Sequence, residues 1–104
     1  MNYSIFLPIT IALMLSAAAI ADGDIAKGKA KSAACAGCHG ANGIAIAPNF
    51  PNLAGQKYLY LTKAIAAYRD GVRNDPTMKA MTAALTDADI ENLGAYFSNL
   101  PSKK

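Results

Sequence analysis

The chain has 104 residues and a formal net charge of +3, from ten basic and seven acidic side chains. This length allows one domain at most, and so small a charge does not argue for a nucleic-acid partner. It permits electrostatic docking to an acidic protein. The sequence holds only two cysteines and one histidine, so any Cys or His chemistry depends on very few side chains.

Residues 1–21 are predicted to be an export signal that is cleaved before Asp22. Ile5 to Leu15 is largely apolar, and Ala19-Ile20-Ala21 fits an A-x-A cleavage site. No Lys or Arg precedes the apolar run, so only the amino terminus supplies positive charge there. The alternative is an uncleaved membrane anchor, but a bilayer span requires about 20 apolar residues and residues 5–21 are shorter.

The predicted mature domain, residues 22–104, is small enough to need help from a disulfide, a metal or a cofactor. It has no second cysteine pair that could act as a staple. We expect an exported, periplasmic protein without stable membrane insertion once the signal is cleaved. The alternative location is tethered to the membrane and facing the periplasm. In either oxidising setting a bare C-x-x-C would tend to become a disulfide unless it is otherwise used.

The first helix is predicted from Asp24 to Ala34, with Asp22 or Asp24 serving near its N-terminus. Gly28 inside it costs about 1 kcal/mol relative to Ala. Tolerance on a surface helix would explain this glycine. Close approach of a second helix is the favoured explanation, because Gly has few other uses in a helix.

The run Cys35-Ala36-Gly37-Cys38-His39 has the spacing for attachment of a c-type haem. Its two thiols can form thioethers with two vinyl groups, and the histidine can be the proximal iron ligand. A thioredoxin-like redox pair would need a βαβ setting, and no strand pattern is visible. A zinc site would need about four ligands, and no second Cys/His cluster exists.

A second helix is predicted from Gln56 to Arg69, ending at Gly71. One apolar stripe supports it, formed by Tyr58, Leu61, Ile65 and Tyr68. The preceding segment, Gly40 to Gly55, contains Pro48 and Pro51 and is predicted to be a loop. A second loop is predicted from Gly71 to Thr77. Irregular backbone of this kind is suited to wrapping the edges of a prosthetic group.

The third helix is predicted from Asp87 to Asn99, because Thr86 to Asp89 resembles a capping box and Pro101 stops the helix. Its apolar face consists of Ile90, Leu93, Gly94 and Phe97. We expect Gly94 to be the partner of Gly28 in a close helix crossing.

With these blocks in this order, the mature chain resembles a class I c-type cytochrome. It is most similar to small bacterial members of the cytochrome c553 type and to half-domains of the di-haem cytochrome c4 type. The matching blocks are Gly28, Cys35 to His39, Ala47 to Gln56, Tyr68 to Gly71, Met78 to Met81, Leu85 to Ile90 and Ala95 to Phe97. No second C-x-x-C-H occurs, so a complete di-haem protein is not expected.

The resemblance implies an all-α cytochrome c fold with three main helices and loops wrapped round one covalent haem c. The N- and C-terminal helices would cross. Cys35 and Cys38 would bind the haem covalently, and His39 would be the proximal ligand. The Pro48 carbonyl would accept a hydrogen bond from the free ring N–H of His39, which fixes the tautomer. A methionine before the C-terminal helix would be the distal ligand.

Met1 and Met14 lie in the predicted signal, which leaves Met78 and Met81 for that ligand. In the resembled family the liganding methionine lies seven residues before the leucine of the Leu-Ser/Thr-Asp block, here Leu85, which selects Met78. Met81 is then expected to pack nearby as core. Both methionines could instead be core gap-fillers. Against that, the chain offers no second histidine for the iron.

An iron with two protein ligands has no open site, which favours electron transfer over oxygen chemistry. We predict an exported single-haem carrier that cycles between Fe(III) and Fe(II), is not an enzyme, and serves redox protein partners. One alternative is a haem electron-relay subunit of an oxidoreductase complex. A gas-binding or peroxidatic haem protein is a further alternative if neither methionine reaches the iron.

Four basic residues are candidates for a ring around an exposed haem edge, although surface lysines are more often merely solvated: Lys57, Lys63, Arg73 and Lys79. Lys79 is the best candidate because it follows Met78. Four tyrosines are expected in the core or in the haem-pocket walls: Tyr58, Tyr60, Tyr68 and Tyr96.

Overall fold

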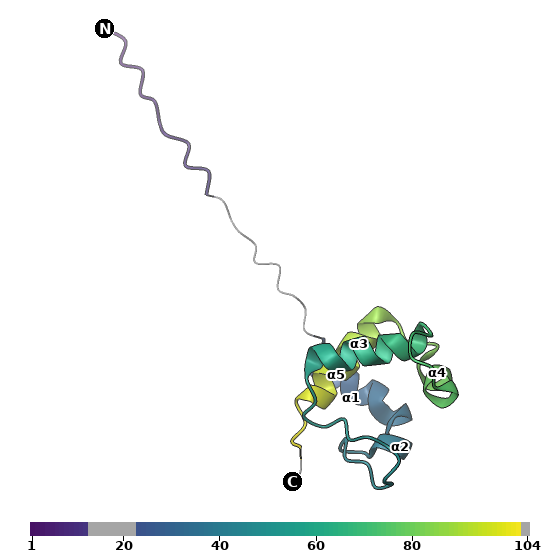
Figure 1. The fold of residues 1–104 in the computed structure, drawn as a ribbon. Helices are drawn as coiled ribbons and strands as arrows, with labels where there is room; N and C mark the ends of the chain where they lie inside the picture. Colours follow the sequence, from purple (N-terminus) through teal and green to yellow (C-terminus); the bar gives the residue numbers. More distant parts are fainter. Residues whose placement is uncertain (13–22, 103–104) are drawn as a thin grey trace.

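A computed structural model describes residues 1–12 and 23–102 of the chain (Figure 1). The ordered elements are α1 (Ile25–Lys31), a 3-10 turn (Ser32–Ala34), α2 (Ala36–His39), α3 (Tyr58–Arg69), α4 (Pro76–Thr82) and α5 (Asp87–Ser98). No strand occurs in these two ranges, and the all-α prediction is confirmed. The predicted cleavage site lies outside the described residues.

No helix within residues 1–12 and 23–102 has the length and apolar character needed to cross a membrane.

Helices α1 and α5, from the two ends of the domain, pack against each other, as predicted (Figure 1). Gly28 allows the close approach, because a Cβ there would collide with the Asn92 carbonyl and lie 2.8 Å from the Tyr96 Cβ. The Asp24 amide also donates to Asn92 Oδ1 at 2.7 Å. The glycine inside the first helix is therefore required by the crossing.

The prediction that Gly94 faces Gly28 is wrong. A Cβ on Gly94 would lie 2.7 Å from Thr62 Cγ2 and 3.1 Å from Tyr58 Cδ2, both on α3. Gly94 therefore lets α3 approach α5, and the two glycines serve different helix pairs. The apolar periodicity identified the buried face of the helix without revealing which neighbour each position meets.

The first helix starts as predicted and ends early. Asp24 caps it by accepting from the Lys27 amide at 3.0 Å. Helix α1 stops at Lys31, where the buried Ser32 hydroxyl donates to the Lys29 carbonyl at 2.7 Å. A serine hydroxyl that bonds a backbone carbonyl three residues earlier competes with the hydrogen bonds of the α-helix. A tighter 3-10 turn follows.

Helix α4 differs from the prediction, which places its first residues at the end of the loop from Gly71 to Thr77. Asp75 is the N-cap and accepts from the Met78 amide at 2.9 Å, while Pro76 stands at the first helical position. Proline is favoured there because that amide needs no helical partner. Asp75-Pro76 is therefore the start of a helix, and this helix carries Met78.

The other boundaries agree closely with prediction. Helix α3 begins at Tyr58, two residues inside the predicted start, and Gly71 follows its cap with a φ of 77°. Helix α5 opens with a full capping box between Thr86 and Asp89. The main buried cluster joins α3 to α5 and consists of Leu61, Leu93, Tyr96 and Phe97.

Candidate functional site

One helical turn carries the three residues of the predicted attachment motif. The His39 amide donates to the Cys35 carbonyl at 2.9 Å, and the Cys38 amide lies 3.3 Å from the same oxygen. Residues at i, i+3 and i+4 of a helix share one face. The local backbone therefore brings both sulfurs and the imidazole to one side of α2.

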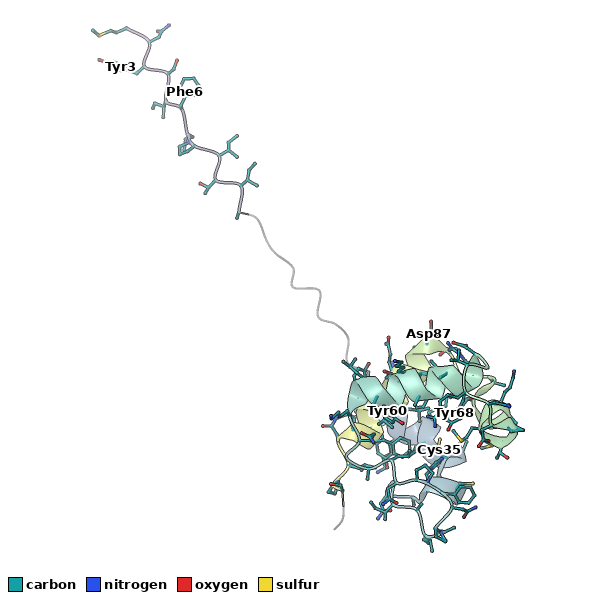
Figure 2. All side chains as sticks on the ribbon, in the orientation of Figure 1. Tyr3, Phe6, Cys35, Tyr60, Tyr68 and Asp87 are labelled. Atoms are coloured by element: carbon teal, nitrogen blue, oxygen red, sulfur yellow. The ribbon has the colours of Figure 1, made fainter. Side chains whose placement is uncertain are left out.

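Both cysteines are free thiols, and both are half-buried. Cys35 packs against the α3–α5 cluster, and Figure 2 labels its position beside α3. Burial, and secondarily the neighbouring Cys38, raises the pKa of the Cys35 thiol. The Cys35 sulfur is thus held as a neutral thiol against the core.

His39 is buried, with 6% of its surface exposed. Its Nδ1 lies 2.8 Å from the Pro51 carbonyl oxygen, which can only accept a hydrogen bond. The proton of the neutral ring therefore belongs on Nδ1, and Nε2 keeps its lone pair for an iron. The ring of Phe50 lies edge-on at 6.4 Å between centroids.

The prediction that Pro48 supplies this carbonyl is wrong. The Gly43 carbonyl accepts from the Leu53 amide at 2.8 Å and from the Ala54 amide at 3.0 Å. These bonds fold the loop back on itself and leave Pro51 next to His39. Nothing in the sequence separates the two prolines, because the choice depends on pairing across the loop.

Met78 is half-buried on α4, with both of its backbone groups bonded to side chains. Its amide donates to Asp75, and its carbonyl accepts from the Thr82 hydroxyl at 2.8 Å. Thr82 is itself buried. Met81 is 48% exposed, so its predicted place in the core is wrong. The sequence prediction missed Asp75 and Thr82 along with the helix they stabilise.

The predicted tyrosine and basic residues fall into different environments. Tyr96 is in the core as expected, while Tyr60 is exposed. The Arg73 guanidinium lies over the ring of Tyr68, 4.4 Å from its centroid, in a cation–π contact. Figure 2 labels Tyr60 and Tyr68 on α3.

The donor set fits one covalent haem c. Two free thiols share a helix face with a buried imidazole whose second nitrogen is already hydrogen-bonded. No group of three or more His, Cys, Asp or Glu side chains in residues 1–12 and 23–102 is arranged to hold a metal ion directly, so the zinc alternative gains no ligand set there.

Comparisons with known proteins agree with this donor set. The cytochrome c4 of Pseudomonas aeruginosa is 44% identical over 89 residues, covering 86% of this chain and 44% of its own length. The cytochrome c-554(548) of Halomonas halodenitrificans is 45% identical over 80 residues, covering 74% of this chain and 96% of its own length. The chain spans about half the length of the cytochrome c4 relatives it matches.

Solved structures and a family model extend the similarity to the fold. The reduced recombinant cytochrome c4 from Pseudomonas stutzeri superposes with a TM-score of 0.73 at 39% identity, over 76% of this chain and 46% of that one. The family model for cytochrome c matches residues 25–101, which contain every residue of the predicted haem site. The chain therefore belongs to the cytochrome c family.

Proposed function

We propose that this protein carries single electrons between redox protein partners through one haem c. Cys35 and Cys38 attach the haem, and His39 and Met78 are its axial ligands. The supporting observation is the His39–Pro51 contact, which leaves the Nε2 of the buried His39 free on the same helix face as two thiols. When bound, the haem supplies an iron that cycles between Fe(III) and Fe(II).

Each protein residue has a defined task in this proposal. Cys35 and Cys38 each add their S–H across one vinyl group, so that a carbon–sulfur bond forms and the hydrogen goes to the adjacent vinyl carbon. This addition needs no external oxidant or reductant. His39 binds through Nε2, while the Pro51 carbonyl holds its Nδ1 proton and keeps the ring oriented.

Met78 completes the proposed coordination from α4. The Asp75 side chain accepts from the Met78 amide and the Thr82 hydroxyl donates to the Met78 carbonyl. These two bonds fix the backbone and so limit the movement of the Met78 side chain. A thioether ligand raises the reduction potential relative to a second histidine. With both axial positions taken, the protein is proposed to be an electron carrier with no catalytic activity of its own.

The visible spectrum tests this assignment. The oxidised protein should be low-spin and show a weak long-wavelength iron–sulfur band. Met78→Ala should abolish that band, and Met81→Ala should keep it because Met81 is 48% exposed and lies outside the core. A high-spin wild-type protein that binds carbon monoxide readily would contradict the carrier function and favour the gas-binding alternative. The reverse mutant result would contradict the choice of Met78 alone.

A second candidate is an electron-relay subunit of an oxidoreductase complex. One relative, named a thiosulfate dehydrogenase electron acceptor, from Stutzerimonas stutzeri (strain A1501), is 38% identical over 73 residues, covering 67% of this chain and 34% of its own length. Stoichiometric co-purification with a larger catalytic subunit would favour this role. A free monomer that passes electrons to several partners would favour the carrier.

Export to the periplasm is the proposed location, with residues 1–21 as the cleaved signal. Large apolar side chains at the start of the chain, including Phe6 and Ile9, are exposed and add nothing to the core. Mass spectrometry of the haem-loaded protein should find a chain that starts at Asp22. A full-length chain in the membrane fraction would support the tethered alternative.

A further inference from the structure

Arg69 bridges the two ends of the chain segment that carries Met78. It is the last residue of α3, and its Nε donates to Asp70 Oδ1 at 2.9 Å, where the segment begins. Its Nη1 donates to the Leu85 carbonyl at 3.2 Å and lies 2.8 Å from Asp87 Oδ1, where the segment ends. One guanidinium thus joins the exit from α3 to the start of α5.

The segment between these ends, residues 70–86, depends on α3 for its position. Among the described helices, α4 packs chiefly against α3, whereas α5 packs against α1 and α3. Swinging α4 away from α3 would not disturb the α1–α5 crossing. A bond that ties the far end of this segment back to α3 therefore limits the movement of Met78.

We infer that Arg69 is a positioning residue for Met78, closing residues 70–86 so that the methionine sulfur stays at the iron. This inference rests on the proposed function. A guanidinium suits the task because its fork of N–H groups reaches several oxygens at once. The Asp87 side chain is 86% exposed and contributes little, whereas the Arg69 side chain is only 20% exposed. The Leu85 carbonyl is therefore the main anchor.

Carbon monoxide binding to the reduced, haem-loaded protein measures the inferred effect. Carbon monoxide reaches the iron only when Met78 has left, so its apparent binding rate follows the population of the opened segment. Loss of a charge-assisted hydrogen bond should raise that population about tenfold in Arg69→Gln. The oxidised variant should also show a weaker iron–sulfur band. Arg69→Lys keeps the charge without the fork and should fall between this variant and wild type.

Two control variants separate positioning from general stabilisation. Lys31→Ala removes the 3.5 Å ion pair with Asp89, which joins α1 to α5 away from α4. It should leave the carbon monoxide rate within about twofold of wild type, because exposed pairs contribute little. Asp70→Asn weakens another ion pair of the same guanidinium. Because Asp70 is adjacent to Arg69 in sequence, this pair does not tie the far end of residues 70–86 to α3. It should behave like Lys31→Ala.

The outcomes are distinct. An unchanged carbon monoxide rate and band in Arg69→Gln would overturn the inference, and so would an equal increase in Lys31→Ala. Amide hydrogen exchange of Met78 offers a second readout, expected to quicken in Arg69→Gln and to stay unchanged in Lys31→Ala. If the wild-type protein lacks the iron–sulfur band altogether, that result contradicts the proposed function. It is distinct from the results above, which contradict the role of Arg69.

Discussion

His39 is held by a carbonyl twelve residues further along the chain. The motif around it is local, since one helical turn aligns both thiols with the imidazole. The contact that selects the imidazole tautomer is not local, because it requires the loop from Gly40 to Gly55 to return to α2. Proximal ligation therefore combines a short sequence pattern with a loop whose path the pattern does not specify.

Replacing the two prolines of this loop tests which carbonyl matters. Pro51→Ala frees the backbone that presents the carbonyl, so the Nδ1–H of His39 should exchange about two- to fivefold faster, corresponding to about 0.4–1 kcal/mol. NMR of the haem-loaded protein measures this exchange. Pro48→Ala is the matched control and should leave the rate unchanged. Faster exchange in Pro48→Ala alone would point to a different loop path.

Among the elements, the crossing of α1 and α5 depends most sharply on one residue. Gly28→Ala would drive a methyl group into the Asn92 carbonyl, and backbone there cannot move aside cheaply. We expect a loss of about 1–3 kcal/mol in unfolding free energy, measured by denaturant titration of the haem-loaded protein.

Gly37→Ala is the control for the same chemical change. A Cβ at Gly37 meets nothing within 4 Å, so this variant should unfold at nearly the wild-type denaturant concentration. Equal stability of the two variants would mean that the helices do not approach as closely as described.

The capping box of α5 makes stability depend on acid pH. The Thr86 amide donates to Asp89 Oδ2 at 3.0 Å and lowers the pKa of that carboxyl below its ordinary value of 3.8. A carboxyl whose pKa is lower in the folded state stabilises the protein above the unfolded pKa. That contribution is lost as the pH falls from 3.8 through the lower folded value.

Asp89→Asn should therefore unfold with less dependence on acid. Its unfolding free energy should fall less than that of wild type between about pH 5 and about pH 2, as denaturant titrations at several pH values would show. Glu91→Gln, on the same helix but outside the capping box, should keep the wild-type slope. An unchanged slope in Asp89→Asn would contradict the role of the Thr86–Asp89 bond.

At the scale of the whole molecule, few apolar side chains in residues 1–12 and 23–102 are buried by protein alone. The buried ones within the described ranges are Ala54, Leu61, Ile90, Leu93, Ala95, Tyr96 and Phe97. Leu59 and Tyr60 on α3 remain exposed. A core of this size rarely supplies more than about 3–5 kcal/mol. We therefore expect the covalent haem to form a large part of the folded core.

Removing the attachment sites tests that expectation. A double variant, Cys35→Ala with Cys38→Ala, should lose most of its cooperative thermal transition and part of its helical circular dichroism signal. The haem-loaded wild-type protein is the reference. Cooperative unfolding of the double variant at the wild-type midpoint would show that the helices need no prosthetic group.

Local patterns were enough to predict the haem motif, the all-α class, the α1–α5 crossing and the capping of α5. Each depends on neighbours three or four residues apart, or on a glycine whose use is sterically narrow. The sequence also contained the start signal of α4, but Asp75-Pro76 suits a turn as well as a helix. Only the folded backbone shows that this segment continues as a helix.

Tertiary structure alone decided which partners meet across the chain. Pro51 faces His39 because the Gly43 carbonyl accepts from amides ten and eleven residues later, Gly94 faces α3, and Arg69 reaches Leu85. Such pairings join residues far apart in sequence, and periodicity carries no information about them. The sequence from Cys35 to His39 was therefore enough to predict the chemistry of the site. The contacts that orient its ligands appeared only in the folded structure.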